Sequence, residues 1–175
     1  MALPFFYTRQ YDTATDQLTL DEDNSRHIVQ VLRMKTGEQL HLTDGKGHLL
    51  TAEIISEHKK HCTVRIREKQ VVERKGRIST IAISLLKNAN RFEWFLEKAT
   101  EMGIQRIIPL LCERTEKEKF RSDRMEQICI SAMLQSQQCW LPDLYPPAAF
   151  HPEQWMAQTG IHLVAHCAAG AKLPA

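Results

Sequence analysis

A helix-length segment in the middle of the chain carries the residues best suited to polar chemistry. Glu93, Glu97 and Glu101 recur at intervals of four, which places three carboxylates on one helix face. Like charges at this spacing repel by about 0.2–0.5 kcal/mol per pair, and the helix dipole disfavours Glu101 in the last turn. We therefore expect a cation to compensate them, and the candidates are Lys87, Lys98, Arg106 and Arg114. The ordinary alternative is a solvated acidic face, and the functional one is a carboxylate in a polar network at the ends of parallel strands.

The segments around this helix predict a parallel sheet. Asn90 is expected to cap the helix, with Glu93 reaching back to its start, and Gly103 is expected to end it. The apolar runs 81–86 and 104–111 have the composition of strands, so strand, helix and strand form a βαβ unit. Further along the chain, the pattern predicts a second helix, the start of a short third helix and a third strand, over residues 120–138, 151–156 and 161–166.

The first 70 residues predict a small β-barrel instead. Short strands are expected at 5–8, 17–20, 39–43, 48–55 and 62–67, and Asp44-Gly45 is a strong hairpin signal between two of them. One helix is expected over 26–34, with Ile28, Val31 and Leu32 as its apolar face. Charge replaces the strand pattern near residue 73, which divides the chain into a barrel (1–73) and an α/β domain (74–175).

Composition excludes some classes of protein and favours others. The 175 residues are 43% hydrophobic and 25% charged, with a net charge of +2, as in ordinary globular proteins. No apolar run approaches the roughly 20 residues that span a bilayer, and the N-terminus lacks the features of a signal peptide. The five cysteines lack CxxC pairs, which favours free thiols in a reducing cytoplasm. The histidines near Cys62 and Cys167 lack the spacing of a zinc site, so no metal is expected.

One segment is strongly basic. Residues 58–77 contain eight Lys and Arg against two Glu. A face that contacts phosphates would explain this composition, although a solvated strand followed by a charged linker is the more common cause.

The motifs together resemble one family. His27-x-x-x-Val31-Leu32-Arg33, Gly37 and Asp44-Gly45 resemble the N-terminal PUA-like barrel of the bacterial small-subunit (16S) ribosomal RNA uridine N3-methyltransferases. The rest of the chain is similar to the family's next segment at Lys87, Arg91-Phe92-Glu93, Glu97-Lys98, Glu101, Gly103, Pro109, Glu113-Arg114, Arg124, Gln135-Ser136 and Leu141-Pro142. Gln137-Gln138 departs from the family, which usually has an Arg there.

The resemblance implies a fold, an activity and a set of residues. The fold is a mixed α+β and α/β one, a PUA-like β-barrel followed by an incomplete SPOUT-type domain, usually a cytoplasmic homodimer. The activity is methylation of uridine N3 in the small ribosomal subunit with S-adenosylmethionine. The residues implied for catalysis are Glu101, Arg114 and Lys87. Those implied for RNA binding are His27, Arg33, Lys35, Arg65, Arg67, Arg91, Lys98 and Gln135.

Family members also carry a Gly-Pro-Glu-Gly-Gly loop and a Leu-Gly…Leu-Arg segment, which form the knot and bind the cofactor. Neither motif occurs in this sequence, so the resemblance implies a truncated form whose cofactor motif lies beyond Ala175. A non-catalytic RNA- or ribosome-binding module is the main alternative function. An α/β enzyme for small molecules is a weaker one.

Overall fold

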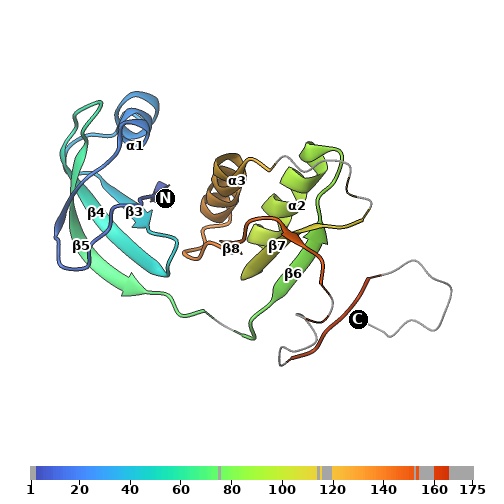
Figure 1. The fold of residues 1–175 in the computed structure, drawn as a ribbon. Coiled ribbons are helices and arrows are strands. Elements are labelled where there is room, and N and C mark those ends of the chain that lie inside the picture. Colours follow the sequence, from blue (N-terminus) through green and yellow to red (C-terminus); the bar gives the residue numbers. More distant parts are fainter. Residues whose placement is uncertain are drawn as a thin grey trace.

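The chain folds into two sheets, each with its own hydrophobic core (Figure 1). The computed structural model describes residues 3–74, 76–113, 115, 120–151, 153 and 160–165. One sheet belongs to the barrel, and the other is the parallel sheet with its helices. This is the mixed architecture that the strand and helix patterns predict.

The N-terminal sheet is curled into a half-barrel by five strands. These are β1 (Phe5–Tyr7), β2 (Gln17–Thr19), β3 (Gln39–Thr43), β4 (His48–Ser56) and β5 (Thr63–Val71). Their order is β1-β3-β4-β5-β2, with β1 parallel to β3 and every other pair antiparallel. Alternate side chains such as Leu40, Leu42 and Ile54 face the core and are fully buried. Two register shifts between β4 and β5 bend the sheet, because a bulge strengthens the local twist.

The helix predicted over 26–34 begins and ends earlier than expected and is differently wound. α1 (Glu22–Arg26) is capped by Asp21, and a π-helix (His27–Val31) follows it directly. The Leu32 amide donates to the His27 carbonyl, five residues back, at 2.9 Å. This bonding adds a residue to the turn, so a spacing of three or four no longer keeps side chains on one face. The predicted apolar face is therefore wrong in part: Ile28 is buried, but Val31 is 65% and Leu32 42% exposed.

The second sheet confirms the predicted βαβ unit. β6 (Thr80–Ser84) and β7 (Arg106–Leu111) are parallel and are joined by α2 (Ala89–Glu101). α3 (Ser122–Gln135) packs beside α2, and both helices contact the core around Ile107. Asn88 rather than Asn90 caps α2, so the predicted return of Glu93 to the helix start does not form. Gly103 has a φ of +77°, as expected after the last turn of a helix.

The predicted third strand is wrong where the structure describes it. Residues 161–165 are neither strand nor helix, and their apolar side chains are exposed. β8 (Asp143–Leu144) and β9 (Ala148–Ala149) pair with β7 instead, both in parallel. Segments of two residues are too short to show the alternation by which a strand is predicted. His166 and most of the short helix predicted over 151–156 lie outside the described residues.

The hairpin between β3 and β4 connects the two halves of the protein. Its residues 44–47 contact residues 139–141, and we call this contact the Trp140 junction. The Gly47 amide donates to the Cys139 carbonyl at 2.8 Å, and the Leu141 amide donates to the Gly45 carbonyl at 2.8 Å. The Trp140 indole donates to the Val72 carbonyl at 2.7 Å and lies under the Arg74 guanidinium. The hairpin that Asp44-Gly45 predicts is thus also a docking surface between the two sheets.

Because three thiols are buried, we expect the protein to lose stability at alkaline pH. Burial raises the pKa of Cys62, Cys129 and Cys139, so the folded state keeps these thiols neutral. In the unfolded chain, thiols ionise near pH 8.5. The contribution of the buried thiols to the free energy of unfolding is therefore complete below that pH and is lost as the pH rises above it. We expect the free energy of unfolding, measured in urea from pH 7 to 10, to fall more steeply for the wild type than for a triple Cys→Ala variant. If the free energies of unfolding of the two proteins fell equally with pH, the buried thiols would not be the cause of the loss.

Candidate functional site

The acidic face of α2 is compensated by a lysine on the same helix. Lys98 Nζ donates to Glu97 Oε1 at 2.7 Å and to both carboxylate oxygens of Glu101 at 3.0 Å. These hydrogen bonds, to Glu97 and then Glu101, raise the pKa of Lys98. Lys98, one of the four cations that the sequence offers, therefore compensates Glu97 and Glu101.

The third glutamate of that face ties α2 to α3. Arg124 Nε donates to Glu93 Oε1 at 2.6 Å, and Arg124 Nη2 donates to Glu93 Oε2 at 2.7 Å. This two-pronged pairing raises the pKa of Arg124 through its hydrogen bond to Glu93. The solvated alternative therefore does not describe Glu93, which joins two helices.

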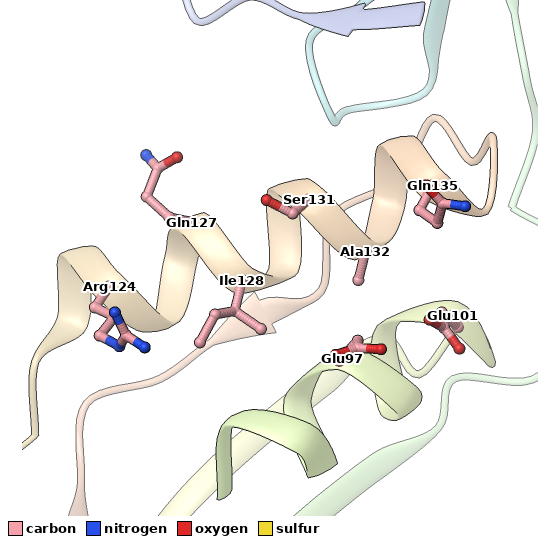
Figure 2. Close-up of a pocket in the computed structure, with 8 residues that line it drawn as sticks. All are labelled: Glu97, Glu101, Arg124, Gln127, Ile128, Ser131, Ala132 and Gln135. Carbon is pink, nitrogen blue, oxygen red and sulfur yellow. The ribbon is translucent and has the colours of Figure 1, made fainter. Parts of the chain in front are cut away.

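A cavity of about 420 Å³ lies between the two helices (Figure 2). Glu97 and Glu101 line it from α2, and α3 supplies the opposite wall. The residues of that wall are Arg124, Gln127, Ile128, Ser131, Ala132 and Gln135. The end of α2 is fixed here, because Gln138 Nε2 donates to the Glu101 carbonyl at 2.7 Å. The cavity therefore brings together Glu101 and Gln135, with Lys98 bonded to the two glutamates of its rim.

Lys87 and Glu101, the two described residues of the three predicted for catalysis, do not converge in this chain. Lys87 follows β6 at the carboxyl edge of the parallel sheet, and Arg91 lies in the first turn of α2. Glu101 is the last residue of α2 and precedes β7, so it lies at the amino edge. A helix of 13 residues spans roughly 20 Å, which separates Lys87 from Glu101 by that order of distance. Arg114 lies outside the described residues.

Sequence reasoning missed a pair of hydroxyl groups at the carboxyl edge. Ser84 Oγ and Thr115 Oγ1 lie 3.2 Å apart, and Thr115 Oγ1 also accepts from the Cys112 amide at 2.8 Å. They join the loop after β7 to the end of β6, near Lys87. A threonine inside a charged, aperiodic stretch gives no signal of such a contact, so only the fold reveals it.

The cations predicted to bind RNA on the barrel divide into two groups. Arg67 Nε donates to Glu53 Oε2 at 2.9 Å, which lowers the pKa of Glu53, and Lys35 Nζ lies 3.4 Å from Glu57 Oε1. Within the described residues, no carboxylate forms an ion pair with His27, Arg33 or Arg65. These three side chains are exposed and are the ones available to an anionic partner.

The described part of the chain contains neither a metal site nor a membrane-spanning helix. No group of three His, Cys, Asp or Glu residues there has the arrangement of a metal site. None of the described helices combines the length and hydrophobicity that crossing a bilayer requires.

Two family models match the chain in the order of its two sheets. An RNA methyltransferase PUA domain matches residues 20–67, and an RNA methyltransferase domain matches residues 73–174. Among curated proteins, the ribosomal RNA small subunit methyltransferase E of Synechocystis sp. is 29% identical over 138 residues, which are 76% of this chain and 44% of that protein. The enzyme of the same name from Bacillus subtilis is 26% identical over 135 residues, 74% of this chain and 53% of its own length. The chain thus spans about half the length of the curated relatives it matches.

Solved structures show the same architecture. A protein from Porphyromonas gingivalis, named a probable rRNA-methyltransferase, superposes with a TM-score of 0.80 at 33% identity, covering 90% of this chain and 65% of its own. The ribosomal RNA small subunit methyltransferase E of Neisseria gonorrhoeae, solved with bound S-adenosyl methionine, gives a TM-score of 0.73 at 26% identity, covering 84% and 62%. With the family model matched over residues 73–174, more than half of the sequence, the chain belongs to the RNA methyltransferase domain family.

Proposed function

We propose that this chain acts in the S-adenosylmethionine-dependent methylation of N3 of a uridine in 16S ribosomal RNA, as a cytoplasmic protein and a homodimer in its complete form. The observation that carries the proposal is the ordered match of an RNA methyltransferase PUA domain and an RNA methyltransferase domain to the two sheets. The two named relatives support the choice of ribosomal RNA, and the Neisseria structure supports the choice of cofactor.

In this proposal the two domains have different roles: residues 1–73 bind the RNA, and residues 74–175 act on the base. The barrel holds RNA through exposed cations, chiefly Arg33 and Arg65, with His27 beside them. Such contacts to phosphates fix the position of the substrate and carry no sequence information. Arg67 and Lys35 would first have to give up their carboxylate partners, so their part in binding is smaller.

The α/β domain supplies the groups that act on the base. N3 of uridine is a nucleophile only after it loses its proton, and a nearby cation stabilises the resulting anion. Lys87 and Arg91 offer two such cations close together at the carboxyl edge of the sheet, where open α/β sheets place their sites. Glu101 lies at the other edge together with Lys98, so it can act on the same base only from another copy of the chain.

The residues present do not by themselves fit the cofactor. The cavity between α2 and α3 is lined by carboxylates, amides, a guanidinium, a hydroxyl and the aliphatic side chains of Ile128 and Ala132, without an aromatic side chain against which an adenine could lie. A second cavity, between α3 and the segment that follows it, includes the aromatic side chains of Phe120 and Tyr145 beside the polar Ser122 and Glu126. Its volume of about 280 Å³ is close to the lower limit of roughly 300 Å³ for small-molecule sites, but no glycine lines either cavity, whereas the resemblance implies a Gly-rich loop at the cofactor. We therefore assign no cofactor contact to the described residues.

A non-catalytic RNA-binding module is the second candidate, and the separation of Lys87 from Glu101 favours it for the chain on its own. Titration calorimetry with S-adenosylmethionine and transfer of a labelled methyl group to small ribosomal subunits separate the two functions. We expect both signals from the protein of the complete reading frame. RNA binding without methyl transfer, also in that protein, would leave only the binding module.

Replacing Glu101 by glutamine tests its role in methylation. We expect the rate of methyl transfer to fall about a hundredfold, the lower end for a group that assists proton transfer. Glu97→Gln is the matched control, because Glu97 bonds the same Lys98 ammonium from the same helix. Equal rates for Glu101→Gln and the wild type would remove Glu101 from the mechanism. If the rate of methyl transfer fell equally in both variants, the effect would come from the changed environment of Lys98 and not from Glu101 itself.

A further inference from the structure

The π-helix of the barrel ends in an exposed aliphatic and cationic tip. We call residues 27–33 the π-turn. Val31 and Leu32 are 65% and 42% exposed, and Arg33 follows with a φ of +57°. Ile28 before them and Met34 after them are buried in the barrel core, so the exposed residues are held between two anchors. The tip is therefore a fixed part of the fold.

Three features of the π-turn are unfavourable for a purely structural element. Single-turn π-helices are rare and occur frequently at functional sites. A left-handed backbone at a residue with a Cβ stores strain, which persists where the surrounding structure requires it. Two large aliphatic side chains in water add a further cost. Together these features point to a partner that contacts this tip.

The charges around the π-turn are arranged to leave Arg33 available. Glu57 accepts hydrogen bonds from Lys35 Nζ and from the Thr36 amide, and Glu38 accepts one from the Lys35 amide at 2.6 Å. These carboxylates are thus occupied by the segment that follows the tip. The Arg33 guanidinium forms no ion pair within the described residues, and the exposed His27 ring packs edge-on against Phe6. The tip presents aliphatic surface next to positive charge.

We propose that the π-turn takes an unpaired nucleotide of single-stranded RNA, with the base on Val31 and Leu32 and a phosphate on Arg33. The inference rests on the proposed function and extends it, since it names which form of RNA the barrel prefers. A duplex stacks its bases and presents phosphates and sugars, from which an aliphatic side chain gains little. A base in a loop or single strand offers a flat face that can pack on apolar side chains, with the phosphate still within reach of a cation.

The test compares one RNA in two forms. The 175-residue chain is titrated into a short fluorescein-labelled single-stranded RNA, and into the same RNA annealed to its complement, with fluorescence anisotropy as the readout. We expect Val31→Ser with Leu32→Ser to weaken single-strand binding roughly fivefold, the factor that corresponds to losing about 1 kcal/mol of apolar contact, and to leave duplex binding nearly unchanged. Val71→Ser is the matched control, because Val71 is 67% exposed at the end of β5, outside the π-turn, and its replacement should change neither affinity.

Arg33→Gly separates function from structure at the same tip. Glycine adopts the left-handed backbone without strain, so thermal unfolding should show no loss of stability. The affinity for RNA should nevertheless fall, and the slope of log affinity against log salt should become smaller by about one phosphate contact. Loss of thermal stability without loss of affinity would make Arg33 a structural residue and overturn its assignment.

The other outcomes are distinguishable. If the serine variant weakens single strand and duplex equally, or neither, the tip does not contact a base and the inference is overturned while the proposed function stands. If only binding to assembled small subunits falls, the tip contacts a ribosomal protein and the inference is likewise overturned. If the wild type binds no RNA at any salt concentration, the proposed function itself fails.

Discussion

Replacing Gly47 by alanine is expected to lower the free energy of unfolding by about 3 kcal/mol. Gly47 has a φ of +96°, and a residue with a Cβ pays about 1–2 kcal/mol for a left-handed backbone. The new Cβ would also lie 2.3 Å from Cζ2 of Trp140, so the indole would have to move. Moving it disturbs the 2.7 Å hydrogen bond to the Val72 carbonyl, and overpacking of this kind adds about 1–3 kcal/mol.

Gly37→Ala is the matched control for this variant. Gly37 has a nearly equal φ of +92°, but a Cβ there would meet no atom within 4 Å. Urea unfolding should therefore show only the backbone cost, about 1–2 kcal/mol. The difference between the two variants measures the contact with Trp140, and equal losses would mean that the Trp140 junction contributes nothing to stability.

Leu96→Ala is expected to destabilise the parallel-sheet domain by about 2–5 kcal/mol. Leu96 is fully buried on α2, within the core formed with Phe92, Ile107 and Met125, and its removal leaves a cavity. Trp94→Ala on the same helix is the control, since Trp94 is 63% exposed and should lose well under half as much.

The Leu96→Ala variant also tests whether the two sheets unfold together, because its loss of stability can be measured separately in each sheet. Hydrogen exchange of the Leu96→Ala variant should show faster opening of β6, β7 and α2, with the strands of the barrel less affected. Uniform acceleration in both sheets would show that the Trp140 junction joins them into one cooperative unit. A loss below about 1 kcal/mol would contradict the packing described for Leu96.

The elements with regular patterns were predictable, and those that depend on distant contacts were not. The βαβ unit and the strands of the barrel follow from spacing, because alternation and helical periodicity reflect one buried face. β8 and β9 are two residues each and exist only by pairing with β7. The predicted strand over 161–166 failed because an apolar run can also lie exposed outside a sheet.

The contacts of the candidate site were likewise predictable only where they are local in the sequence. The sequence indicated that the row of glutamates needs a cation, and Lys98 meets that need one and three residues from its partners. It could not indicate that Arg124 pairs with Glu93, because that contact depends on how α3 lies against α2. Nor could it separate Lys87 from Glu101 in space, since both appear beside one helix when only the sequence is considered. The structure adds the direction of the strands, which places them at opposite edges.

The position of Trp140 also has a consequence for the nascent chain. Gly47 and Trp140 are 93 residues apart in the sequence, and ribosomes add roughly 5–20 residues per second. The tip of the β3–β4 hairpin therefore emerges about 5–20 s before the indole that will cover it. During that interval two glycines with unusual backbone angles have no neighbour to hold them in place. A slow codon between these positions would lengthen the interval, and a chaperone that shields hairpins would matter most during this period.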